Sequence, residues 1–309
     1  MTTTMNGEAR ALTEELGEGP GRVSVRKAYK MYVGGAFVRS ESGRYTQVTE
    51  SPGSESRENV PRASRKDARD AVLAARSAQD GWAERTAFNR GQILYRLGEM
   101  LESRQGELTA SLERSGVTAK QAAIEVAATV DRAVAFAGWT DKYQSLLSSL
   151  NPVAGPHFNF TSPEPMGVVV IVAPKRPALL GIATALLPVI ACGNTCVVLA
   201  SEEDPRTPLI FAESLATSDL PSGVVNILTG EVAEVLPHLA RHMEVAALDL
   251  HDVAPDVVKS AQTLAADNVK RVRTHALEEG GFYDPALTES LQCISRFVEM
   301  KTIWHPAGS

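Results

Sequence analysis

The sequence has few cysteines, few aromatic residues and no surplus of positive charge. Its 309 residues include three cysteines, Cys192, Cys196 and Cys293. Three are too few for a disulfide framework and are typical of a reducing compartment. Lys and Arg number 31 against 37 Asp and Glu, which gives a formal net charge of −6. This balance argues against a nucleic acid as partner.

Long apolar runs are also missing. No stretch reaches the roughly 20 consecutive apolar residues that cross a bilayer. The N-terminal sequence lacks the apolar segment of a signal peptide. We therefore expect a cytoplasmic protein with no membrane partner. Hydrophobic residues still make up 44% of the chain, which is enough for a core in one large or two moderate domains.

Residues 166–230 alternate between apolar strands and apolar helices. The strands are short, β-branched and bounded by Pro or Gly, as expected for strands that are buried on both faces. Strand, helix, strand, helix, strand with short connections predicts an α/β fold with a Rossmann-like, doubly wound parallel sheet. The expected strands are Val168–Ala173, Cys196–Leu199 and Val224–Leu228, and the expected helices are Ala178–Ile190 and 204–215.

The remaining elements are predicted on both sides of this stretch. Before it, we expect a tail at 1–25, a hairpin around Gly34 and Gly35, and several helices. One of these helices begins after Ser64, and another runs over Thr118–Leu147 with a kink near Gly138. After it, we expect helices at Glu231–Leu239 and Ala254–Ala265 and strands at Val245–Leu250 and Val269–Val272.

Two segments carry a family resemblance. ACGNTCVVLASEEDP at 191–205 and DLPSGVVNILTG at 219–230 resemble, in order and spacing, AAGNTVVLKPAE and GLPPGVVNIVPG of the aldehyde dehydrogenase superfamily. In that family they belong to the dinucleotide-binding core. The resemblance therefore implies the same Rossmann-like fold and, in a full-length member, NAD-dependent aldehyde oxidation.

The resemblance breaks off after the fifth strand. Family members continue into an ELGGK loop and a catalytic domain with the nucleophilic cysteine. Here residues 271–292 lead directly to Ile294–Pro306, which resembles the family's C-terminal strand. This arrangement resembles the second, degenerate unit of the two-unit aldehyde dehydrogenases of family 16, with the catalytic domain missing.

The resemblance also suggests a division of the chain. Residues 26–275 would form a degenerate dinucleotide-binding-type domain with N-terminal helices. A bridge strand at 157–165 would be inserted in this domain, and 276–309 would supply a linker helix and a C-terminal strand. In the family, the bridge and C-terminal strands serve oligomerisation. We therefore expect a hetero-oligomer with a full-length aldehyde dehydrogenase, or a homo-oligomer.

Several positions that carry chemistry in the family differ here. Arg176 stands where the family has the Asn that stabilises an oxyanion. Leu199 stands where a Lys reaches the ribose hydroxyls, and a hydroxyl that loses its partner on burial costs about 1–3 kcal/mol. Glu202 matches the family's Glu and is a remnant of the cofactor site. The resemblance therefore implies no catalytic residue in this chain.

The family's pyrophosphate loop is replaced as well. Small residues of an FTGSTEVG loop meet the pyrophosphate in the family, whereas this chain has Leu250–Val257. Asp252 and Asp256 would place negative charge beside a negative ligand, and Val257 replaces a close-approach Gly. We therefore expect no cofactor, or at most weak NAD binding.

Other candidate groups have two interpretations each. Cys293 is either a relocated catalytic thiol or a small apolar residue of a helix. Cys192 and Cys196 have a CxxxC spacing, but buried thiols are the preferred interpretation. His238 and His242 are spaced like zinc ligands on a helix, yet the sequence offers no third ligand. The sequence therefore predicts no metal site.

Lys175 and Arg176 form a basic spot where a strand of an α/β sheet ends, which is where such sheets bind ligands. They either bind an anion or pair with Glu202 or Glu203.

Three functions follow from these patterns. The first is a catalytically inactive aldehyde dehydrogenase-like subunit with a structural or regulatory role in an oligomer. The second is residual NAD-dependent aldehyde oxidation, and the third is a binding module for an anionic metabolite.

Overall fold

A seven-stranded sheet forms the centre of the computed structural model, which describes residues 26–307. Its strand order is β11-β10-β7-β8-β9-β1-β2. The first five strands are parallel, and the β1-β2 hairpin pairs antiparallel with β9. From β7 the chain adds β8 and β9 on one side and then β10 and β11 on the other, so the sheet is doubly wound as predicted. Its strands are β1 (Met31–Val33), β2 (Ala36–Val38), β7 (Val168–Val172), β8 (Thr195–Leu199), β9 (Val225–Leu228), β10 (Val245–His251) and β11 (Arg271–His275).

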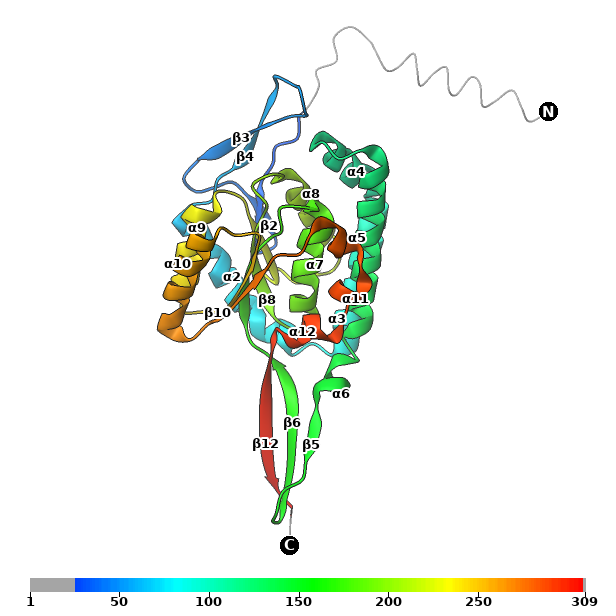
Figure 1. Ribbon diagram of the computed structural model, residues 1–309, viewed down its shortest axis with the longest axis vertical. Helices are drawn as coiled ribbons and strands as arrows, with labels where there is room; N and C mark the ends of the chain where they lie inside the picture. The colour runs from blue at the N-terminus through cyan, green and yellow to red at the C-terminus, as the bar shows by residue number, and fades with distance from the viewer. Residues whose placement is uncertain (1–25, 308–309) are drawn as a thin grey trace, which may run out of the picture.

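Helices cover both faces of the sheet (Figure 1). On one face α7 packs on α5 and α8, and α5 packs on α3 and α4. On the other face α2 contacts β8 and α9, and α9 contacts α10. No helix within residues 26–307 is long and apolar enough to cross a membrane. The helices are α2 (Arg65–Ala83), α3 (Ala87–Ser103), α4 (Gln105–Arg114), α5 (Ala119–Trp139), α6 (Tyr143–Leu147), α7 (Ala178–Ala191), α8 (Arg206–Ala216), α9 (Val232–Arg241) and α10 (Pro255–Ala265).

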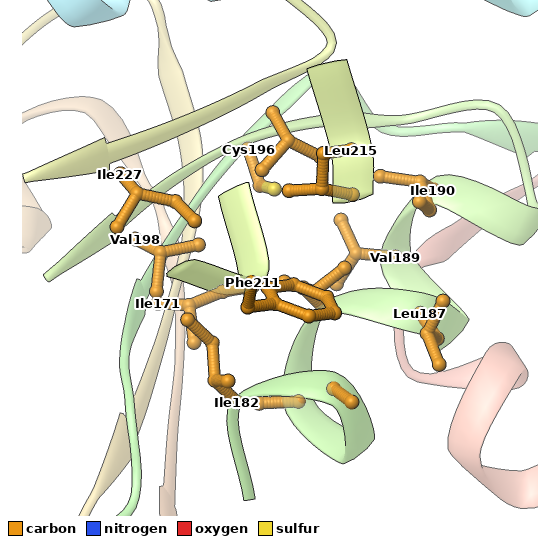
Figure 2. Close-up of a cluster of buried hydrophobic side chains, with 14 of the residues drawn as sticks. Ile171, Ile182, Leu187, Val189, Ile190, Cys196, Val198, Phe211, Leu215 and Ile227 are labelled. Carbon is orange, nitrogen blue, oxygen red and sulfur yellow. The ribbon is translucent and has the colours of Figure 1, made fainter. Parts of the chain in front are cut away.

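The core lies between the sheet and these helices. All residues of β7, β8 and β9 are buried, because both faces of each strand are covered. Figure 2 shows the α7–α8 side, where the ring of Phe211 lies among Ile171 of β7, Val198 of β8 and Val189 of α7. The sulfur of Cys196 lies in the same apolar cluster.

Local signals at the N-terminal end are confirmed. Gly34 and Gly35 have φ values of 59° and 80°, which the two-residue turn of the β1-β2 hairpin requires. A Cβ on Gly35 would lie 2.2 Å from the Ser222 hydroxyl oxygen, so a larger residue does not fit. Ser64 caps α2, because its hydroxyl accepts the Asp67 N–H while the Asp67 carboxylate accepts the Ser64 N–H.

Two predicted elements differ from the structure. The helix expected over Thr118–Leu147 is not one kinked helix, because α5 ends at Trp139 and α6 follows as a separate turn. The last strand of the sheet begins at Arg271 rather than Val269, which has a φ of 57°. A valine in this left-handed conformation cannot extend a strand. The β3-β4 hairpin (Tyr45–Thr49 and Arg57–Pro61) was not predicted, since its strands are largely polar and exposed.

A second sheet extends away from the body as an arm (Figure 1). Its order is β12-β6-β5, with β12 at Val298–Pro306, β6 at His157–Pro165 and β5 at Ser149–Asn151. β12 pairs with β6 antiparallel over nine residues, from Val298 opposite Pro165 to Pro306 opposite His157. The strand at 157–165 lies where it was predicted, whereas the C-terminal strand begins at Val298 rather than Ile294, because Ile294 and Ser295 belong to a helical turn.

Three short helical turns connect β11 to this arm. They are η2 (Glu279–Tyr283), α11 (Pro285–Thr288) and α12 (Leu291–Ser295), and they follow η1 (Ala266–Asn268), which lies before β11. These short turns occupy the region where a linker helix was expected. The predicted tail at 1–25 and the last two residues lie outside the described part of the chain.

Candidate functional site

A groove of about 220 Å³ lies at the carboxyl ends of β7, β8 and β10. This is where the order of the doubly wound sheet reverses, and α/β sheets bind ligands at such a reversal. Lys175 and Glu202 both line the groove, so the structure brings these two predicted residues together. Residues from the starts of α9 and α10 complete its walls.

The Glu202 carboxylate already accepts a hydrogen bond from the backbone of the protein. Its Oε1 atom accepts the backbone N–H of Val232 at 2.6 Å, in the first turn of α9. A carboxylate is favourable at a helix N-terminus because it faces the positive end of the helix dipole. Glu202 therefore stabilises α9, and a ligand hydroxyl would have to share the carboxylate with that N–H.

Asp252 also lines the groove. Its Oδ2 atom accepts the backbone N–H of Lys175 at 3.1 Å. Its φ of 51° is a left-handed conformation, which glycine adopts without strain and aspartate tolerates. An aspartate at this position adds negative charge to a wall where the resemblance places a phosphate-binding loop.

The start of α10 offers little to an anion. Pro255 is the first residue of the helix and has no N–H, and Asp256 adds a negative charge in the first turn. The side chain of Val257 lines the groove. An anion at the backbone N–H groups of this helix end would therefore lie next to the Val257 side chain and the Asp256 carboxylate.

Leu199 does not face the groove. It is 3% exposed and packs in the apolar cluster beneath α2 and α9. Ala200, the next residue, lines the groove instead. The methyl group of Ala200 donates no hydrogen bond. Neither Leu199 nor Ala200 can therefore make the hydrogen bond to a ribose hydroxyl that the family's Lys makes.

Arg176, unlike Lys175, does not line the groove. Its Nε atom is 3.3 Å from Glu203 Oε2, and both side chains are about half exposed. It borders a separate small hollow, which is also lined by Lys175 and by the carboxylates of Glu125, Asp204 and Glu279. Because acidic groups outnumber the two basic residues there, Arg176 balances negative charge in this hollow rather than adding positive charge to the groove.

Glu125 of α5 is a buried residue that the sequence reasoning missed. Its Oε1 atom accepts the N–H groups of Leu179 at 2.7 Å and Leu180 at 3.2 Å, at the start of α7. Burial raises the pKa of this carboxyl above its ordinary value, although the two N–H groups act in the opposite direction. A signal was present, since Glu125 falls between Ala122 and Val126 on the buried face of α5.

The cysteines are buried in the fold. Cys192 and Cys196 are fully covered, and burial raises the pKa of Cys192 to about 12 and raises that of Cys196 as well. A thiol with a raised pKa is a poor nucleophile at neutral pH. Cys293 lies in α12 with its Sγ atom 3.6 Å from the carbonyl oxygen of Leu287. Cys293 is therefore a buried residue of a short helix, which agrees with its interpretation as a small apolar residue.

His238 and His242 line a surface hollow together with Arg65, Arg69 and Arg241. Within residues 26–307, the side chains that do converge as a metal site would are Asp249, His251 and His275. The sequence reasoning missed this group, because its members come from two strands that are separated by α10 in the sequence.

Comparison with known proteins agrees with this architecture. The sequence pattern of the aldehyde dehydrogenase family matches residues 37–283. Cytosolic 10-formyltetrahydrofolate dehydrogenase of Mus musculus is 31% identical over 286 residues, which cover 89% of this chain and 31% of that protein. Aldehyde dehydrogenase, cytosolic 1, of Elephantulus edwardii is 32% identical over 250 residues, which cover 79% of this chain and 49% of that protein.

The fold comparison gives the same result. The NAD⁺ complex of an aldehyde dehydrogenase from Bacillus cereus superposes with a TM-score of 0.75 at 27% identity. The match covers 80% of this chain and 50% of that one. The chain thus spans about a third of the formyltetrahydrofolate dehydrogenases and half of the shorter enzymes. By sequence pattern, relatives and fold, this chain belongs to the aldehyde dehydrogenase family.

Proposed function

We propose that this chain is a catalytically inactive, cytoplasmic subunit of the aldehyde dehydrogenase family that works by assembly. It would associate with itself or with a full-length aldehyde dehydrogenase, in a structural or regulatory role. The observation that carries the proposal is the pairing of β12 with β6 over nine residues. Only residues 276–297 separate β12 from β11, so the arm forms although no catalytic domain lies between these strands.

The surface of the arm supports assembly. Four large apolar side chains stand exposed on its three strands, namely Leu150, Phe158, Met300 and Trp304. β12 and β5 are the edges of this sheet. Exposed apolar residues beside unpaired strand edges favour pairing with another chain.

The groove supports inactivity. Glu202 and Asp252 are both bound to backbone N–H groups of the protein, and Val257 occupies part of the space. Buried thiols with raised pKa values leave Cys192 and Cys196 unsuited to attack an aldehyde.

Native mass tests the proposal. The full-length chain, tagged and recovered from its own host extract, should run as an oligomer, either alone or with a full-length aldehyde dehydrogenase. A chain that is truncated before Arg296 loses β12 and should run as a monomer. An unchanged native mass after this truncation would contradict the proposed role of the arm. The matched control Arg96→Gln, on the exposed face of α3, should leave the mass unchanged.

Two other functions rest on separate observations. Residual NAD-dependent oxidation is favoured by the likeness to an NAD⁺ complex, and it requires that NAD raise the melting temperature. Anion binding is favoured by Lys175 at the groove and Arg176 beside it. Inorganic phosphate and citrate are suitable probes, and an affinity that Arg176→Ala leaves unchanged would rule out a role of Arg176 in anion binding.

A further inference from the structure

Asp249, His251 and His275 converge at the carboxyl ends of two neighbouring strands. Asp249 and His251 are two residues apart on β10, so their side chains leave the same face of the sheet. His275 ends β11 directly opposite His251 in the parallel register. The three side chains therefore meet at the carboxyl ends of β10 and β11, although the two histidines are 24 positions apart in the sequence.

The donor atoms of the three residues are close together. His275 Nε2 lies 2.7 Å from Asp249 Oδ1, and His251 Nε2 lies 2.9 Å from Asp249 Oδ2. The two imidazole rings stack with their centroids 4.5 Å apart and an interplanar angle of 16°. One ligand atom from each residue fits within a span of 4.8 Å.

We propose that these three residues form a zinc site. Two imidazoles and one carboxylate are ligands that Zn²⁺ and Co²⁺ bind well. Tetrahedral coordination with bonds of about 2.1 Å places ligand atoms about 3.4 Å apart. The nitrogen–oxygen distances of 2.7 and 2.9 Å observed here therefore need to widen by about 0.5–0.7 Å. Water would take the fourth position, because three protein ligands leave it open.

The surroundings provide a buried anchor and a path of entry. Asp249 is 2% exposed, so a partner for its negative charge is worth more there than at the surface. The side chain of His251 is 10% exposed and that of His275 is 18% exposed. His251 also lines the groove described above, which gives an ion access from solvent.

Protonation changes when the ion binds. Both Nε2 atoms now face carboxylate oxygens, so each carries a hydrogen that it donates. An ion bound through Nε2 displaces this hydrogen, and a neutral imidazole then keeps its single proton on Nδ1. Arg273 lies opposite Asp249 on β11, and its positive charge opposes that of the ion. We therefore expect a weaker affinity than that of a site without a neighbouring cation.

Titration of the full chain tests the site. After treatment with a chelator, calorimetry with Zn²⁺ should show one ion per chain. Co²⁺ should give the visible absorption bands of a low-symmetry site. Asp249→Asn, His251→Gln and His275→Gln should each weaken Zn²⁺ binding by about tenfold or more, since each removes a ligand. The α9 control, His238→Gln/His242→Gln, changes His238 of α9 and His242, which directly follows the helix, and should leave the affinity unchanged.

Two results would overturn the assignment. If the chelator-treated wild-type chain takes up no Zn²⁺, the three residues form only a hydrogen-bonded group. If the α9 control loses the ion while His275→Gln keeps it, the ion binds elsewhere. Should Asp249→Asn fail to fold, the two histidine variants decide the question, because both rings reach the surface.

Discussion

Glu125 Oε1 lies 2.7 Å from the backbone nitrogen of Leu179, and through this hydrogen bond α5 holds the first turn of α7. Helix N-termini have N–H groups without intrahelical partners, and a buried one is costly if left unpaired. No residue next to α7 in the sequence supplies a side-chain cap. A glutamate from a helix more than fifty residues earlier does so instead, at the point where the family resemblance places catalytic machinery.

This buried carboxyl makes stability depend on pH. Burial raises the pKa of Glu125 in the folded state, whereas the pKa of a glutamate in the unfolded chain is about 4.3. Over the range between these values the folded state holds a proton that the unfolded state has lost, so stability falls as pH rises. Relative to Glu125→Gln, the wild-type free energy of unfolding should therefore decrease from about pH 4 upward and level off above the folded pKa.

Urea denaturation at pH 4 to 7 measures this difference. The control is Glu102→Gln, which changes an exposed glutamate of α3, and its difference from wild type should stay constant. Parallel curves for the wild type and Glu125→Gln would contradict the prediction.

Arg206 should be far more important for stability than an exposed arginine. Its guanidinium lies 2.9 Å from Glu58 and also donates to the carbonyl oxygens of Thr49 and Glu50, which holds the β3-β4 hairpin against α8. Both charged side chains are more than 90% buried. Arg206→Ala leaves the buried Glu58 carboxylate with only the longer 3.5 Å contact to Arg114, so we expect a loss of about 3–5 kcal/mol.

An exposed ion pair provides the comparison for Arg206. Arg96→Ala breaks the pair with Glu99 on α3, where both side chains are nearly half exposed. Its cost should be at most about 1 kcal/mol. Equal losses for the two alanine variants in urea denaturation would show that the buried pair contributes no more than the exposed one.

Phe211 should be the most sensitive position of the cluster in Figure 2. Its ring is fully buried between α7 and strands β7 and β8. Phe211→Ala removes this contact area and leaves a cavity, so we expect a loss of about 3–5 kcal/mol. Phe88→Ala is the matched control, since Phe88 is 70% exposed on α3, and it should change stability by about 0.5 kcal/mol or less. A loss below about 1 kcal/mol for Phe211→Ala would mean that the cluster relaxes around the missing ring.

The sequence predicted the sheet better than the site. Strands such as Val168–Val172 are continuous apolar runs, and their burial on both faces follows from composition alone. The β3-β4 hairpin was missed because it is polar, and its attachment depends on Arg206, a long-range contact. The cluster of Asp249, His251 and His275 was missed because it also depends on long-range contacts. The register of β10 and β11 brings its members together.

NAD should stabilise this chain only slightly. Asp252 and Val257 both line the groove, and Glu202 accepts a hydrogen bond from the Val232 N–H. If the dissociation constant is above 1 mM, then 1 mM NAD adds less than about 0.4 kcal/mol to the free energy of unfolding. The melting temperature should then shift very little in a thermal-unfolding experiment, whereas a full-length aldehyde dehydrogenase treated in parallel should show a clear increase. An increase of equal size in this chain would refute the expectation of weak binding and favour residual oxidoreductase activity over a purely structural role.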